Sequence, residues 1–317
     1  RRATSSEHSG EHHTDWVMSC SFFERNGEPR VLSTSSDGTL KVWDVHGAKN
    51  EPLCTFGADQ HGPDKKPAWI MGCYVFTRDG RVVAVSSSQD YTLRLWRLDA
   101  DGETDNDLRP ECIFKGHNDW VNGCCAYLDE NARGGKKWKV LSCCDDQTLK
   151  VWDASEDGGE TAPSITRESR QRGCIGTLRG HTNVVISCCT FTHKRKIYGL
   201  SSAGDNTLRL WDLDNYRCLR TLQCTDGTRG CWVHSNQQSV TAVSCCGLHD
   251  NADSHTVRLW DLRQVLERVE NSKRIHPGAI KAADVKAVTE WATGEICSGS
   301  LRGKLTTSRE LEQVRVH

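Results

Sequence analysis

The chain has 317 residues, a formal net charge of -1 and 17 cysteines. This near-neutral balance gives no general attraction to nucleic acid or to an anionic membrane, which argues against both as partners. No apolar run approaches the roughly 18–20 residues that span a bilayer. We therefore expect a cytoplasmic protein, with the nucleus as the alternative compartment.

The first predicted strand begins in "HTDWVMSC" (13–20), after a polar start that has neither an initiator methionine nor the apolar core of a signal peptide. We expect the chain to be a fragment or a trimmed form of a longer protein. A near copy of this stretch recurs at 117–125, and looser copies recur at 68–73 and 231–235. Their shared Trp serves either the packing of the fold or a binding surface.

A second pattern repeats along the chain and predicts strands in pairs. Its copies are "LSTSSDGTLKVWD" (32–44), "AVSSSQDYTLRLWR" (84–97), "LSCCDDQTLKVWD" (141–153), "LSSAGDNTLRLWD" (200–212), "SHTVRLWD" (254–261) and a degenerate "CSGSLRGKLTTSR" (297–309). They recur roughly every 50–60 residues. Each joins two strands rich in β-branched residues through a tight turn, with one strand ahead and one behind. Four antiparallel strands in a repeated unit form a propeller blade.

The Trp-Asp dipeptides that close four of these copies, together with Gly116-His117 and Gly180-His181, resemble the WD-repeat family. The resemblance implies an all-β fold, a β-propeller of four-stranded antiparallel blades in a single domain over residues 1–317. Six repeats are visible, roughly at 13–56, 66–114, 117–178, 181–223, 229–270 and 276–317. Because the family most often has seven blades, the propeller is either six-bladed or has its last blade outside this chain.

The resemblance also implies a buried network that links a His, a Ser of the second strand, the turn Asp and the Trp. The matching residues are His13, Ser33, Asp37, Trp43, His117, Ser142, Asp146, Trp152, His181, Ser201, Asp205 and Trp211. The second unit matches through Ser86, Asp90 and Trp96, but no His lies in register. The fifth unit lacks Gly-His, and the sixth has Arg302 and Ser308 where Asp and Trp are expected. These residues are expected to be structural rather than catalytic.

The cysteines predict neither a metal site nor a disulfide scaffold. No C-x-x-C occurs, and the vicinal pairs, such as Cys124-Cys125, point to opposite faces of a strand. We interpret the cysteines as reduced, buried side chains. Phosphate-binding, nucleophile-elbow and zinc-protease motifs are missing as well. The sequence predicts no enzyme, no metal and no cofactor.

A candidate binding surface comes from aligning the units on the Val or Ile that begins the first strand. In the family this position enters the innermost strand on the top face, so the resemblance places the preceding and following residues at the mouth of the central channel. These residues include Trp16, Trp69, Trp120 and Trp232, then Met18, Met71, Asn122, His234 and Lys281, with Asp15 and Asp119 on the rim. Packing of each Trp against the neighbouring blade is the alternative.

Two functions follow as hypotheses. The first is a non-catalytic scaffold or adaptor whose aromatic and acidic top face binds a protein or peptide with a cationic anchor, with a regulatory domain of a larger protein as one form of it. The second is an RNA- or RNP-associated propeller. The short basic clusters "KKWK" (136–139) and "HKRK" (193–196) favour the second hypothesis. The loop "ASEDGGETAPSITRESRQRG" (154–173) is expected to be solvated.

Overall fold

The computed structural model describes residues 12–46, 51–57, 67–98, 109–155, 170–224, 227–236, 239–246, 256–272 and 314–315. The chain divides into two compact units, Arg1–Thr177 and Leu178–His317. Within the described ranges, no helix is long and apolar enough to cross a membrane.

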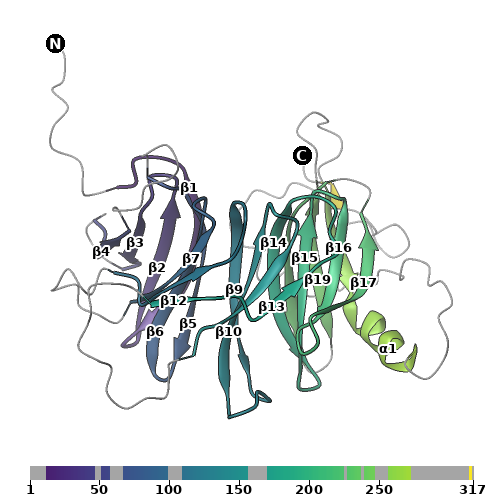
Figure 1. The fold of residues 1–317 in the computed structure, drawn as a ribbon. Coiled ribbons are helices and arrows are strands. Elements are labelled where there is room, and N and C mark those ends of the chain that lie inside the picture. Colours follow the sequence, from purple (N-terminus) through teal and green to yellow (C-terminus); the bar gives the residue numbers. More distant parts are fainter. Residues whose placement is uncertain are drawn as a thin grey trace. The chain divides into compact units, whose positions relative to one another are not determined.

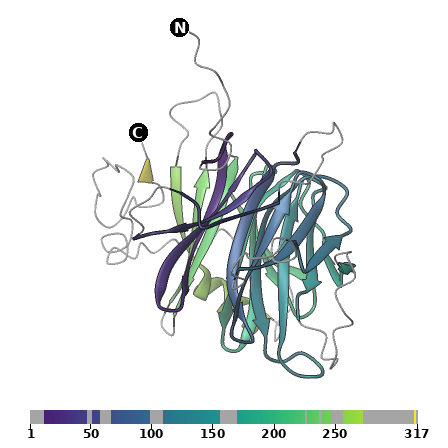
Figure 2. The same cartoon turned by 90° about the vertical axis from the view of Figure 1, so that its left-hand side faces the viewer.

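The first unit contains three sheets, whose strands can be followed in Figure 1. The first sheet, seen in purple facing the viewer in Figure 2, has the order β1 (Val17–Arg25), β2 (Glu28–Ser35), β3 (Leu40–Asp44) and β4 (Cys54–Phe56). The second sheet consists of β5 (Ile70–Arg78), β6 (Arg81–Ser88), β7 (Thr92–Arg97), β8 (Cys112–Lys115) and β12 (Arg170–Arg172). The third consists of β9 (Val121–Asp129), β10 (Lys137–Cys144), β11 (Leu149–Asp153) and β13 (Gly176–Leu178).

The described residues of the second unit form two sheets and one helix. The fourth sheet has the order β14 (Val185–His193), β15 (Lys196–Ala203), β16 (Thr207–Asp212) and β17 (Arg217–Gln223). The fifth has the order β18 (Thr228–Ser235), β19 (Val240–Cys246), β20 (Thr256–Asp261) and β21 (Val314–Arg315). The helix α1 (Leu262–Ser272) follows β20 directly.

Tight two-residue hairpins connect the first two strands of the first, second and fourth sheets, with positive φ at both turn residues. Asn26-Gly27 and Asp79-Gly80 form such turns in the first and second sheets, as expected for residues that tolerate the left-handed region. In the fourth sheet the same turn is made by Lys194 and Arg195, with φ of 47° and 62°. Ordinary side chains adopt this conformation at a cost of about 1–2 kcal/mol per residue.

The first strand of every sheet carries a β-bulge near its start. The register shifts between Val17 and Ser19, Ile70 and Gly72, Val121 and Gly123, Val185 and Ser187, and Thr228 and Gly230. In each case one extra residue is inserted opposite the second strand. The shared bulge fixes which residues of the five sheets are equivalent.

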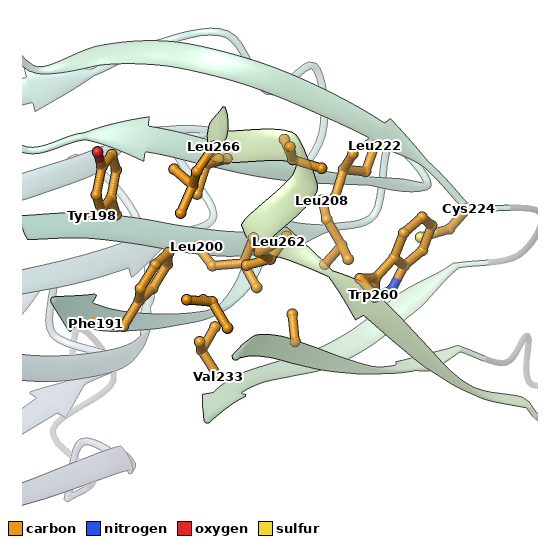
Figure 3. Close-up of a cluster of buried hydrophobic side chains, with 14 of the residues drawn as sticks. Phe191, Tyr198, Leu200, Leu208, Leu222, Cys224, Val233, Trp260, Leu262 and Leu266 are labelled. Atoms are coloured by element: carbon orange, nitrogen blue, oxygen red, sulfur yellow. The ribbon is translucent and has the colours of Figure 1, made fainter. Parts of the chain in front are cut away.

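Apolar side chains from consecutive sheets pack together within each unit. In the second unit, Phe191 and Leu200 of the fourth sheet lie with Val233 and Trp260 of the fifth in one buried cluster, shown in Figure 3. Leu262 and Leu266 of α1 join the same cluster. Their spacing of four residues places both side chains on one face of the helix, which explains how α1 covers this core.

Cysteines of the first strands contact the preceding sheet at equivalent positions. The thiols of Cys73, Cys124 and Cys231 lie 3.9, 3.5 and 3.7 Å from the carbonyl oxygens of Leu32, Val85 and Leu200. Burial raises the pKa of Cys73 to about 12, so this side chain stays a neutral thiol at physiological pH. The small thiol therefore fits where two backbones approach closely.

The all-β class and the antiparallel sheets agree with the sequence, but three details differ. The described residues form five sheets where six units were expected. Most of the sixth unit (276–317) lies outside the described residues, and Val314–Arg315 pairs with β20 of the fifth sheet. The loop at 154–173 supplies β12, which pairs in parallel with β8 as a fifth strand of the second sheet. The expectation that the whole loop is solvated was therefore wrong, because its end satisfies the hydrogen-bonding groups of a sheet edge.

Candidate functional site

Three tryptophans occupy the same position at the entry to the first strands of the first unit. The carbonyl oxygens of Trp16, Trp69 and Trp120 accept hydrogen bonds from the backbone N–H groups of Ser36, Gln89 and Asp145, each at 2.9 Å. In the fourth sheet, Gly204 donates to Val184 at the same distance. Each bond ties the entry residue to the turn between the second and third strands. The backbone of the entry position is therefore fixed, and the side chain varies.

Two of the entry tryptophans contact each other. The ring centroids of Trp69 and Trp120 lie 6.0 Å apart with an interplanar angle of 53°, and both side chains are half-buried. Trp16 is different, because 73% of its surface is exposed. The Trp69–Trp120 pair thus combines packing between the second and third sheets with residual exposure, while Trp16 presents most of its indole to solvent.

The acidic residues before two of these tryptophans shape the entry loops. The carboxylates of Asp15 and Asp119 accept hydrogen bonds from the backbone N–H groups of Trp16 and Trp120, both at 2.8 Å. Asn183 does the same for Val184 at 2.8 Å. Because a neutral Asn can take this role, the negative charge of the two aspartates is not required for the loop geometry.

An acidic group lies beside the Trp69–Trp120 pair in the third sheet. Asn122 donates to the carboxylate of Asp145 at 2.6 Å. Burial raises the pKa of Asp145, and the nearby charges of Asp119 and Asp146 raise it further, against the opposing effect of the Asn122 hydrogen bond. A nearby cation would favour the ionised form of this carboxyl. The entry of the third sheet is therefore suited to a positively charged ligand group.

The residues that follow the first Val or Ile are the inserted residues of the bulges. Met18, Met71, Asn122 and Ile186 are all half-buried. A bulge interrupts the alternation of a strand and re-aims the inserted side chain. This explains why the residue type varies here while the flanking Ile70, Val121 and Val185 are buried.

The assignments in the fifth unit need correction. The bulge between Thr228 and Gly230 makes Thr228, not Val233, the equivalent of Val17. Trp232 therefore lies in the middle of β18 and His234 near its end, opposite Val243 and Thr241, and their rings are 6.1 Å apart. The Trp-Val pair misled the alignment, whereas Cys231 falls in register with Cys20, Cys73, Cys124 and Cys188. The bulge position belongs to the exposed Arg229, and Lys281 lies outside the described residues.

The hydrogen-bonded network expected from the family pattern is present in three sheets. The Nδ1 atoms of His13, His117 and His181 lie 2.9, 2.8 and 2.9 Å from the carboxylates of Asp37, Asp146 and Asp205. Their Nε2 atoms lie 2.7, 2.8 and 2.7 Å from the hydroxyl oxygens of Ser33, Ser142 and Ser201. The same hydroxyls accept from the indole N–H groups of Trp43, Trp152 and Trp211 at 2.7, 2.9 and 2.8 Å.

The protonation of this network is set by burial and by the aspartate. Burial lowers the pKa of His117 and His181, with opposition from Asp146 and Asp205. Burial alone would raise the pKa of Asp146, but hydrogen bonds from His117 and Thr148 outweigh it and the pKa falls well below its usual range. A neutral His that donates to an ionised Asp satisfies both partners.

The second and fifth sheets use different partners. In the second sheet, Trp96 donates to Ser86 at 2.8 Å, while the carboxylate of Asp90 binds Arg94 at 2.5 Å in place of a His. In the fifth, Trp260 donates to Ser244 at 2.9 Å. The sequence pattern missed Arg94, although it lies two residues before the repeat Trp. It missed Ser244 because the enlarged turn separates it from Trp260 by more residues than in the other units.

One group of side chains in the third sheet has the composition of a metal site. Ligand atoms of His117, Cys144 and Asp146 lie within 4.8 Å of one another. Cys144 contacts the carbonyl of Asp119 at 3.2 Å and accepts from the N–H of Asp146 at 3.3 Å. Ser35 makes the equivalent bonds in the first sheet at 3.2 and 3.0 Å. The group is therefore the structural network itself, with a thiol in the place of a hydroxyl.

Comparison with known proteins agrees with this geometry. The family model "WD domain, G-beta repeat" matches residues 5–44, 108–153 and 172–212, which contain the three networks that include a His. These three segments of the chain are therefore WD repeats. The three matched repeats correspond to the first, third and fourth sheets, and in the second and fifth sheets no His among the described residues joins the Trp–Ser pair.

Several curated proteins are similar to this WD-repeat chain. It is 25% identical over 274 residues to the "Ribosome biogenesis protein YTM1" of Coccidioides immitis, covering 79% of this chain and 54% of the relative. It is 29% identical over 252 residues to the "Ribosome biogenesis protein WDR12 homolog" of Drosophila mojavensis, covering 79% and 52%. It is 25% identical over 234 residues to "Ribosome biogenesis protein ytm1" of Aspergillus niger, covering 63% and 44%. The chain spans about half the length of the curated relatives it matches.

Proposed function

We propose that this WD-repeat chain is a non-catalytic scaffold in the assembly of a ribonucleoprotein particle, of the kind that ribosome biogenesis requires. The observation that carries the proposal is the shared description of the relatives as ribosome biogenesis proteins. The His and Asp residues that could suggest catalysis are engaged in fold-stabilising hydrogen bonds. The relatives offer no support for the cytoplasmic placement, and we place the chain in the nucleus, the alternative compartment.

We propose that the entry residues Trp16, Trp69 and Trp120 contribute to a protein-binding surface. The exposure of Trp16, the half-buried Trp69–Trp120 pair and the neighbouring Asp145 support a partner with a cationic side chain. An Arg or Lys can lie over an indole face and approach the carboxylate at the same time. Trp232 and His234 are not part of this surface, because the register places them in the second half of β18, away from the strand entry.

The experiment compares Trp16→Ala with Trp120→Ala in affinity purification from nuclear extract, followed by identification of the co-purified proteins. We expect both variants to lose assembly factors, and Trp16→Ala to keep the melting temperature of the wild type because its indole is exposed. Ser142→Ala serves as the matched control, since it perturbs the buried network and leaves the entry residues unchanged. Retention of every wild-type partner by both Trp variants would refute the binding surface.

We also propose that the sheets are consecutive blades of one propeller, to which residues 276–313 add a sixth. Contacts between the first strands of successive sheets within each unit, β1 with β5, β5 with β9 and β14 with β18, support this arrangement. A single compact domain of this length has a radius of gyration of about 20 Å. Small-angle scattering of the whole chain would give a clearly larger value if the two units were separate domains.

A further inference from the structure

The tip of the β14–β15 hairpin carries three consecutive exposed cations, Lys194, Arg195 and Lys196. The first two occupy left-handed backbone conformations, with φ of 47° and 62°. The corresponding hairpins of the first and second sheets use Asn26-Gly27 and Asp79-Gly80, which are the residues that such turns prefer. The same fold therefore has a low-strain solution that the fourth sheet does not use.

Across the described parts of the chain, this hairpin is the one place where two consecutive residues other than glycine have positive φ. Strain of this kind persists when the residues serve something other than stability. The flanking Phe191, Ile197 and Tyr198 are buried, so the tip is held by the core beneath it. Compared with an Asn-Gly turn, Lys194 and Arg195 add positive charge at an exposed tip that the core beneath it holds in place.

A second basic cluster lies in the third sheet and its first hairpin. In 136–139, Lys136 contacts Glu130 at 2.8 Å, Lys137 contacts Asp153 at 3.4 Å and Lys139 contacts Asp129 at 2.8 Å. These lysines form ion pairs within the third sheet and its hairpin. This cluster therefore offers a matched comparison in which lysines support local structure.

We propose that the β14–β15 hairpin tip, Lys194 to Lys196, binds the phosphodiester backbone of RNA. The inference rests on the proposed function, which brings the chain to a ribonucleoprotein particle. Lys and Arg neutralise phosphates through charge-assisted hydrogen bonds, and Arg can contact two phosphate oxygens at once. Insertion into a membrane surface needs exposed apolar side chains beside the cations, and the large apolar side chains flanking this tip are buried.

The test is the double substitution Lys194→Asn/Arg195→Gly, which reproduces the turn of the first sheet and removes two charges. Binding of the full chain to a fluorescein-labelled single-stranded RNA of about 20 nucleotides is followed by anisotropy at several salt concentrations. Two lost phosphate contacts reduce the slope of log K against log salt by about 1.4, which corresponds to roughly 25-fold weaker binding at 0.1 M salt. The melting temperature of the variant should rise, because the left-handed strain is relieved.

Lys136→Asn/Lys137→Gly, the matched control, removes two lysines of the ion-paired cluster and should leave the salt slope unchanged. Arg195→Lys keeps the charge and should keep most of the affinity. An unchanged slope in the Lys194→Asn/Arg195→Gly variant overturns the proposal. Loss of binding to an acidic peptide or to phosphatidylserine vesicles, with RNA binding intact, overturns it as well. If this variant still co-purifies assembly factors, the scaffold function stands whatever the RNA result. If the wild type co-purifies none, the scaffold function is refuted and the RNA-binding result is unaffected.

Discussion

The second and third sheets solve the same structural problem with different side chains. In the third sheet, Trp152, Ser142, His117 and Asp146 form a continuous chain of hydrogen bonds. In the second, the Trp–Ser bond is kept, and the turn aspartate Asp90 instead pairs with Arg94. The comparison teaches that the indole–hydroxyl bond is the common element and that the turn carboxylate needs a donor, which either His or Arg can provide.

The largest effect is expected from removing the common element. Trp152 is fully buried, so Trp152→Ala should lower the free energy of unfolding by about 3–5 kcal/mol through lost packing and a cavity. Trp43→Ala should cost less, because Trp43 is only half-buried. Chemical denaturation of both variants measures the difference, and equal losses would show that burial does not determine the contribution.

Removing the His donor should have the next largest effect. His117→Ala leaves the carboxylate of Asp146 and the hydroxyl of Ser142 without a hydrogen-bond partner that they share in the wild type. Asp146 keeps its hydrogen bond from Thr148 and Ser142 keeps its bond from Trp152, but losing a buried hydrogen bond to a charged group should still cost about 2–3 kcal/mol. The double variant His117→Ala/Asp146→Ala should recover part of this loss in the same denaturation experiment. No recovery would contradict a direct interaction between the two residues.

Arg94→Ala in the second sheet should cost less, about 1–2 kcal/mol. The Arg94–Asp90 pair lies closer to solvent, with side-chain exposures of 11% and 15%, so water can replace part of the interaction. Arg94→Lys keeps the charge and should restore about half of the loss. If Arg94→Ala lowers the free energy of unfolding more than His117→Ala does, the ion pair stabilises its sheet more than the His network does.

The smallest effect is expected from acidification, because the His of the third sheet and the Asp–Arg pair of the second lose their contributions to stability at different pH. The pKa of His117 is lowered on folding, chiefly by burial, so its stabilisation is present above the unfolded pKa of about 6.5 and is lost as the pH falls below it. The pKa of Asp90 is also lowered, because Arg94 and Thr92 outweigh burial, and its contribution is lost only as the pH falls below about 4. Between pH 7.5 and 5, melting temperatures should decline less steeply in His117→Asn/His181→Asn than in the wild type. Identical slopes would contradict this origin of the pH dependence.

Much of the fold could be predicted because its determinants are local. Turn residues such as Asn26-Gly27, together with β-branched strands, predict hairpins without reference to distant residues. The candidate site was harder to predict from the sequence, since Trp-Val at 232–233 copies the entry motif but lies in the middle of β18. The decisive signal was the bulge, which depends on pairing with β19. Ser244 was missed because the enlarged turn separates it from Trp260, whereas Arg94 lies only four residues after Asp90 and a local pattern could have found it.

The sequence by itself determined the repeated unit, its turns and its Trp-Ser-Asp-His pattern, because each depends on residues close together in one hairpin pair. The tertiary structure decided which tryptophans pack and which are exposed, since Trp69 contacts Trp120 of the next sheet while Trp16 presents its ring to solvent. It also decided the partners of the sheet edges, where β12 and β21 arrive from distant parts of the chain. Edge pairing joins segments far apart in sequence, and local preferences carry no information about which segments will meet.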